Sequence, residues 1–153
     1  AERLTRLAFP LLLTILFFAI VVFLCERLLG RAVRYPALAA AFLYGPATGQ
    51  FEPGRIDHHA PQIVLLVGAV AALVQALTAG RPRAAALAGV ALSLSMAISV
   101  ENVPFFVALL AALVLLWVLD GARVSGLLAW FAAGMAVALP LVVCVVCILR
   151  ARS

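Results

Sequence analysis

Residues 102–119 read NVPFFVALLAALVLLWVL, a run of eighteen residues without a charge. A helix of about 20 predominantly apolar residues crosses the roughly 30 Å hydrocarbon layer of a membrane. Because backbone N–H and C=O groups in lipid must find partners within their own element, such a run is expected to be helical. This stretch alone therefore predicts one membrane-spanning helix.

The rest of the chain has the same character. Of its 153 residues, 67% are apolar and only 11% are charged, whereas a soluble domain is about half apolar and a quarter charged. A chain of this size has too much surface to hide so much hydrocarbon from water. The composition excludes a soluble enzyme, a disordered segment and a disulfide scaffold. Further charge-free runs cover residues 7–25, 35–51, 60–80, 84–100 and 124–149.

The sequence thus predicts an all-α, polytopic transmembrane helix bundle of about six helices, forming a single domain over residues 1–153. The second helix is the weakest prediction, because two prolines and two glycines interrupt residues 35–51. A re-entrant segment is the alternative there. The predicted helices lie near residues 7–29, 35–50, 60–79, 84–100, 104–119 and 124–149.

Arginine placement favours six crossings over five. All eleven basic residues are arginines, and the formal net charge is +5. With six crossings, the loops on one side hold six arginines and those on the other hold only Arg55, whereas five crossings split them four to three. Since basic loops stay in the cytoplasm, we predict a multi-pass protein of the cell inner membrane with both termini outside. The six inner arginines are Arg27, Arg31, Arg34, Arg81, Arg83 and Arg123.

Both histidines lie in one polar stretch, QFEPGRIDHHAPQ at residues 50–62, which this topology places on the outer side. In an extended segment Asp57 and His59 would point the same way and could share a divalent ion, while His58 would point away. The planar guanidinium group of Arg55 can donate two parallel hydrogen bonds to phosphate oxygens. The simpler alternative is that loops at a membrane surface collect polar residues because water is there.

Two neighbouring features bear on this stretch. Pro61 suits the first position of a helix, so the polar residues precede a helix N-terminus, whose positive dipole end attracts phosphate. Glu101 lies in a predicted outer turn and is a possible additional metal ligand. A solvated acid near a helix start is the more common arrangement. No basic stretch is interleaved with aromatic residues, which argues against nucleic-acid binding.

The segment Gly54-Arg55-Ile56-Asp57-His58-His59, placed between two predicted membrane helices, resembles the Asp-His-His motif of the GT-C superfamily of membrane glycosyltransferases. It is most similar to the archaeal-type catalytic subunit of oligosaccharyltransferase, over about a dozen residues. In that family the first and third motif residues help to hold a divalent metal, Mn or Mg. The resemblance therefore implies a metal at Asp57 and His59, and a polyprenyl-phosphate-linked sugar donor beside Arg55 and His58.

The resemblance covers only part of the family's pattern. The family's first catalytic aspartate lies in an outer loop after its first helix, and nothing before Arg3 supplies it here. We therefore expect a partial glycosyltransferase that is inactive as a single chain, with a partner chain completing the active site. A small non-catalytic multi-pass protein, such as a transporter part or an assembly subunit, is the alternative. Against that alternative, no charge falls in mid-membrane.

Metal dependence separates these two functions. If the metal interpretation is correct, Mn²⁺ or Mg²⁺ changes the thermal stability of the purified protein and Asp57→Ala removes the change. A metal response that survives the double change of Asp57 and His59 to alanine would show that this stretch is not the metal site.

Overall fold

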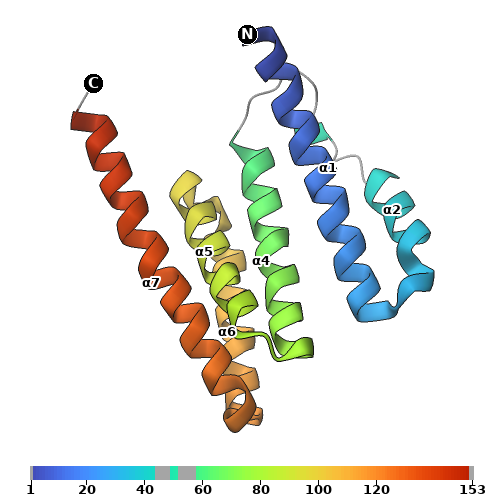
Figure 1. Ribbon diagram of the computed structural model, residues 1–153, viewed down its shortest axis with the longest axis vertical. Helices are drawn as coiled ribbons and strands as arrows, with labels where there is room; N and C mark the ends of the chain where they lie inside the picture. The colour runs from blue at the N-terminus through green and yellow to red at the C-terminus, as the bar shows by residue number, and fades with distance from the viewer. Residues whose placement is uncertain (1, 44–48, 52–57, 152–153) are drawn as a thin grey trace.

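The computed structural model describes residues 2–43, 49–51 and 58–151. Six α-helices lie within these residues and run up and down side by side (Figure 1). This confirms the prediction of an all-α helix bundle. The helices are α1 (Glu2–Leu29), α2 (Arg34–Leu43), α4 (His59–Ala79), α5 (Pro82–Ile98), α6 (Val103–Leu119) and α7 (Gly121–Ala151); short 3₁₀ turns cover Arg31–Val33, Gly49–Phe51 and Val100–Asn102.

Four segments are long and apolar enough to cross a membrane, namely Ala8–Leu29, His59–Ala79, Val100–Leu119 and Gly121–Cys144. The chain is accordingly a multi-pass membrane protein. The fifth apolar helix, α5, has 17 residues and a length of about 26 Å. Its length is therefore close to the lower limit for a full crossing.

The structure describes only part of the predicted second crossing, residues 35–50. Helix α2 has 10 residues and spans about 15 Å, half of the hydrocarbon layer. Its described residues end at Leu43. Residues 44–48 lie outside the described part. Helix α1 ends at one end of the bundle and α4 begins at the opposite end, as the six-crossing order requires (Figure 1).

The turns of the bundle fall into two groups at opposite ends. The turns that follow α1, α4 and α6 lie at one end, and these are the arginine-rich segments (Figure 1). The start of α4 and the turn between α5 and α6 lie at the other end. At the arginine-rich end, the Glu26 carboxylate of α1 accepts a hydrogen bond from Arg34 and raises the pKa of that guanidinium. This ion pair ties the start of α2 to α1.

Helix α5 is the most deeply packed helix of the bundle, and its partner α7 lies directly against it. Ala85 and Ala88 are fully buried. A Cβ placed on Gly89 would overlap the carbonyl oxygen of Phe131, and one placed on Gly134 would overlap that of Ala86. The two backbones therefore touch. Small residues permit this close approach, which gives membrane helices the dispersion contacts that hold them together.

A second apolar cluster joins α1 to the start of α4. Phe51 packs on Phe17 of α1, with ring centroids 5.3 Å apart, and Ala60 and Val64 complete the cluster. All four residues are buried. The cluster fixes the first turn of α4 against α1, which matters because that turn carries both histidines.

The contact between α5 and α7 predicts that Gly134→Ala destabilises the protein by about 2 kcal/mol, since the added methyl group has no room beside a backbone carbonyl. Gly126→Ala on the same helix is the control, because nothing lies within 4 Å of a Cβ there. It should change the free energy of unfolding by no more than about 1 kcal/mol. Denaturant unfolding in detergent measures both, and equal effects would contradict the close packing.

Candidate metal centre

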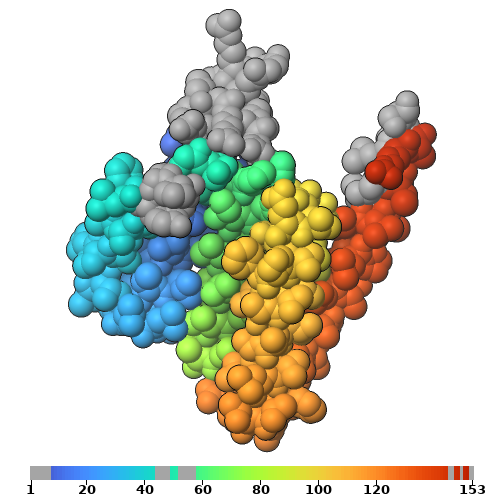
Figure 2. Space-filling model, turned by 180° about the vertical axis from the view of Figure 1, so that it is seen from behind, coloured from blue at the N-terminus to red at the C-terminus, as the bar shows by residue number. Residues whose placement is uncertain are grey.

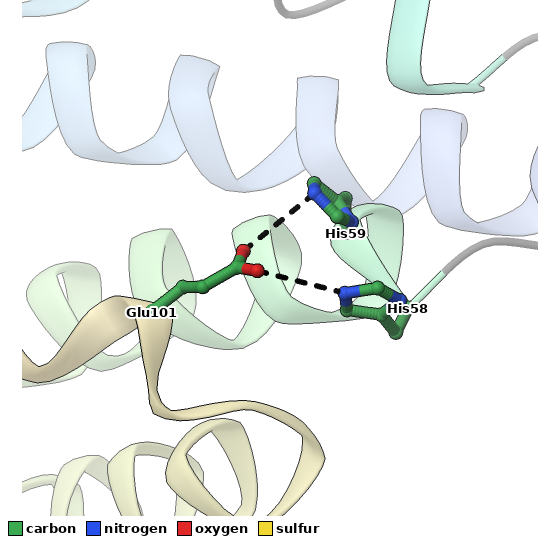
Figure 3. Close-up of side chains that lie close together, drawn as sticks. All are labelled: His58, His59 and Glu101. Carbon is green, nitrogen blue, oxygen red and sulfur yellow. Dashed lines mark ion pairs between the residues drawn. The ribbon is translucent and has the colours of Figure 1, made fainter.

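Three potential metal ligands meet at the end of the bundle opposite the arginine-rich turns. The Nε2 atom of His59 lies 3.6 Å from Oε2 of Glu101, and Nε2 of His58 lies 4.0 Å from Oε1 of the same carboxylate. All three ligand atoms lie within 4.8 Å of one another. The Glu101 carboxylate points toward both imidazole rings from the turn between α5 and α6 (Figure 3).

The expectation that His58 points away from His59 was wrong. It assumed an extended backbone, but His58 has φ −71° and ψ −18°, which is already helical. The two ring centroids lie 4.1 Å apart as a result. Consecutive residues at the start of a helix can both face a neighbouring turn, unlike consecutive residues of a strand. Asp57 and Arg55 lie outside the described residues, so the pairing of Asp57 with His59 stays a prediction.

Hydrogen bonds to α4 and α5 hold the Glu101 turn in place. Gln62 of α4, 3% exposed, donates from Nε2 to the carbonyl oxygen of Ser99 over 3.0 Å. Asn102 donates to Oγ of Ser95 in α5 over 2.7 Å, and the Glu101 N–H donates to Oγ of Ser99 over 3.4 Å. The turn is therefore bonded to both helices, and Glu101 is fixed beside the start of α4.

Sequence reasoning placed Glu101 on the same face as the histidines but missed the residues that anchor it. Gln62 and Asn102 are polar residues that border long apolar runs. Because an unpaired amide in such a setting costs free energy, each needed a partner. This requirement was the one sign in the sequence that Gln62 and Asn102 form hydrogen bonds. Packing decides which groups are their partners, so residue spacing does not identify those partners.

The donor set suits a transition-metal ion. Two imidazole nitrogens and one carboxylate oxygen are ligands that Zn²⁺ and Mn²⁺ accept, whereas Mg²⁺ prefers oxygen ligands and water. Ligand atoms around one ion lie roughly 3–3.5 Å apart, so the separations found here need only small side-chain movements. The side chains of His59 and Glu101 are 37% and 59% exposed, which leaves the group open to solvent.

No family model, curated protein or solved structure matches the chain. The interpretation of the centre therefore depends on the residues and their geometry.

The geometry predicts that Glu101→Gln weakens Mn²⁺ binding by at least about tenfold, since the variant loses the only carboxylate that the described residues contribute to this group. Asp120→Asn is a matched control, because Asp120 is an exposed acid that follows α6 at the opposite end. Isothermal titration of the detergent-solubilised protein measures both affinities. An equal affinity for the two variants would exclude Glu101 as a ligand.

Proposed function

We propose that this chain is part of a GT-C-type membrane glycosyltransferase. Its reaction would transfer a sugar from a polyprenyl-phosphate-linked donor to an acceptor on the outer face of the cell inner membrane. The observation that carries the proposal is the convergence of His58, His59 and Glu101 at one end of a membrane helix bundle. The arginine-rich turns at the other end favour the cytoplasmic side for that end, and hence the outer side for the histidines.

The residues at this end have complementary roles in the proposed reaction. His58, His59 and Glu101, together with Asp57, would hold a divalent metal, and the imidazoles favour Mn²⁺ over Mg²⁺. Such an ion supplies Lewis-acid stabilisation of the charge that develops on a leaving phosphate. Arg55 would pair with the phosphate oxygens, and the positive dipole end of α4 would favour the same anion.

A cavity below the metal centre would accommodate the isoprenoid chain of the donor. Its volume is about 340 Å³, and its walls are almost entirely apolar. On α4, Leu66 and Val70 follow His59 by seven and eleven residues. They therefore share its helix face and lie roughly 10–17 Å deeper in the membrane. The lining residues are Leu24, Leu66, Val67, Val70, Phe105, Ala108 and Leu109.

The second wall of this cavity comes from α6, which lies beside α4 (Figure 2). Phe105 and Ala108 follow Glu101 by four and seven residues, so this wall descends from the turn that carries the carboxylate. A phosphate at the metal centre and an isoprenoid chain in the cavity would thus belong to one molecule. The proposal also includes a partner chain that supplies the further acidic residue of the family's active site.

Binding of a short-chain polyprenyl phosphate tests the proposal. We expect Mn²⁺ to strengthen this binding, and Ala108→Phe to weaken it by about tenfold because the ring fills the cavity. Val107→Phe is the control, since Val107 is an exposed neighbour on the same helix that does not line the cavity.

The comparison ligand is the matching polyprenol, which lacks the phosphate. Equal binding of polyprenol and polyprenyl phosphate, or binding of the phosphate that does not depend on Mn²⁺, would contradict the proposed function. Both affinities can be measured by thermophoresis in detergent micelles.

A further inference from the structure

A second site of different chemistry lies at the arginine-rich end. Arg81 and Arg83, in and just after the turn that joins α4 to α5, line a cavity of about 500 Å³. Gln75 of α4 contributes an amide to the same cavity. Its remaining lining becomes apolar toward the bundle centre, at Ala72 and Leu87. The cavity thus has a cationic mouth and an apolar floor.

The floor continues into a larger apolar groove. A cavity of about 640 Å³ also has Ala72 and Leu87 in its lining, so the two spaces adjoin along α4 and α5. The opposite wall of the groove comes from α1, which lies next to α4 (Figure 1). Every residue that lines this second cavity is apolar or glycine, including Phe23, Gly68 and Val90. A chain that followed the groove would remain within the hydrocarbon layer.

The two guanidinium groups at the mouth differ from those of Arg34 and Arg123, which have partners among the described residues. Arg34 pairs with the carboxylate of Glu26, and Arg123 donates to the carbonyl oxygen of Leu77 over 3.0 Å. Within the described part of the chain, no acidic side chain or hydrogen-bond acceptor meets the side chain of Arg81 or Arg83. Two uncompensated charges therefore face the membrane surface above an apolar groove.

Two further features favour an anion at this mouth. Helix α5 begins at Pro82, so the positive end of its dipole points toward the two arginines. On the α1 side, the guanidinium of Arg27 lies over the ring of Phe23, 5.9 Å from its centroid, and Phe23 lines the groove. A third cation thus borders the same region.

We propose that this groove binds an anionic phospholipid of the inner leaflet. The phosphate of its headgroup is held by the planar donor forks of Arg81 and Arg83, and one acyl chain lies along the apolar groove between α1, α4 and α5. Basic pockets between membrane helices on the cytoplasmic side recognise anionic headgroups in this way, and that leaflet carries anionic lipids. The site is separate from the metal centre, which lies at the opposite end of α4 and α5.

Native mass spectrometry of the delipidated protein tests this site with phosphatidylglycerol and phosphatidylcholine. We expect phosphatidylglycerol to bind preferentially, and the double variant Arg81→Gln/Arg83→Gln to weaken its binding by roughly tenfold or more. The double variant Arg31→Gln/Arg34→Gln is the control, because it removes the same charge at the same end outside the groove. It should leave the preference unchanged. Equal losses of phosphatidylglycerol affinity in the two double variants would show that the preference comes from general surface charge. That result would overturn the proposal.

A third variant tests the acyl-chain groove without changing any charge. Leu87→Trp places a large ring where the two cavities adjoin and should weaken phosphatidylglycerol binding by a similar factor. Leu141→Trp on α7, which is also well exposed, is its control and should have no effect. Unchanged binding by Leu87→Trp overturns the proposal. So does full displacement of the lipid by soluble glycerol phosphate, because the site would then recognise phosphate alone.

Discussion

The backbones of α5 and α7 touch at Gly89 and Gly134, where even one methyl group has no room. Lipid tails are as apolar as leucine, so burial of apolar surface does little to hold these helices together. Close packing between small residues supplies the attraction instead. Helix α5 packs between α7 and α4, and this packing fixes the positions of both of its ends. Each end contributes residues to a candidate site.

The two ends of α5 differ in chemistry. At one end, the Ser99 carbonyl and the Ser95 hydroxyl hold the turn that presents Glu101 to the two histidines. At the other end, Arg81 and Arg83 lie above an apolar groove and have no partner among the described residues. One centre collects anionic and imidazole ligands suited to a cation, and the other collects cations suited to an anion. A bundle with a cation-binding group at one end and an anion-binding group at the other is suited to ligands that combine a charged head with a hydrocarbon chain.

The helices could be predicted from the sequence because lipid allows few other structures for an apolar run. The last four agree with the predicted ranges to within a few residues. The prediction was wrong at His58, where local backbone geometry decides the direction of the side chain. The sequence argument assumed an extended backbone, but His58 is helical and faces Glu101. Residues 44–48 lie outside the described part, so the full length of the second predicted helix stays a prediction. The anchors Gln62 and Asn102 depend on partners in other segments, which spacing does not reveal.

The central claim is that both histidines and Glu101 bind one divalent ion. Electron spin-echo spectroscopy of Mn²⁺ added to the purified protein tests it most directly, because bound imidazole nitrogen modulates the echo. The account predicts modulation from two histidine nitrogens, reduced to one in His58→Ala and in His59→Ala. An echo with no nitrogen modulation, from an ion coordinated only by water and carboxylates, would contradict it.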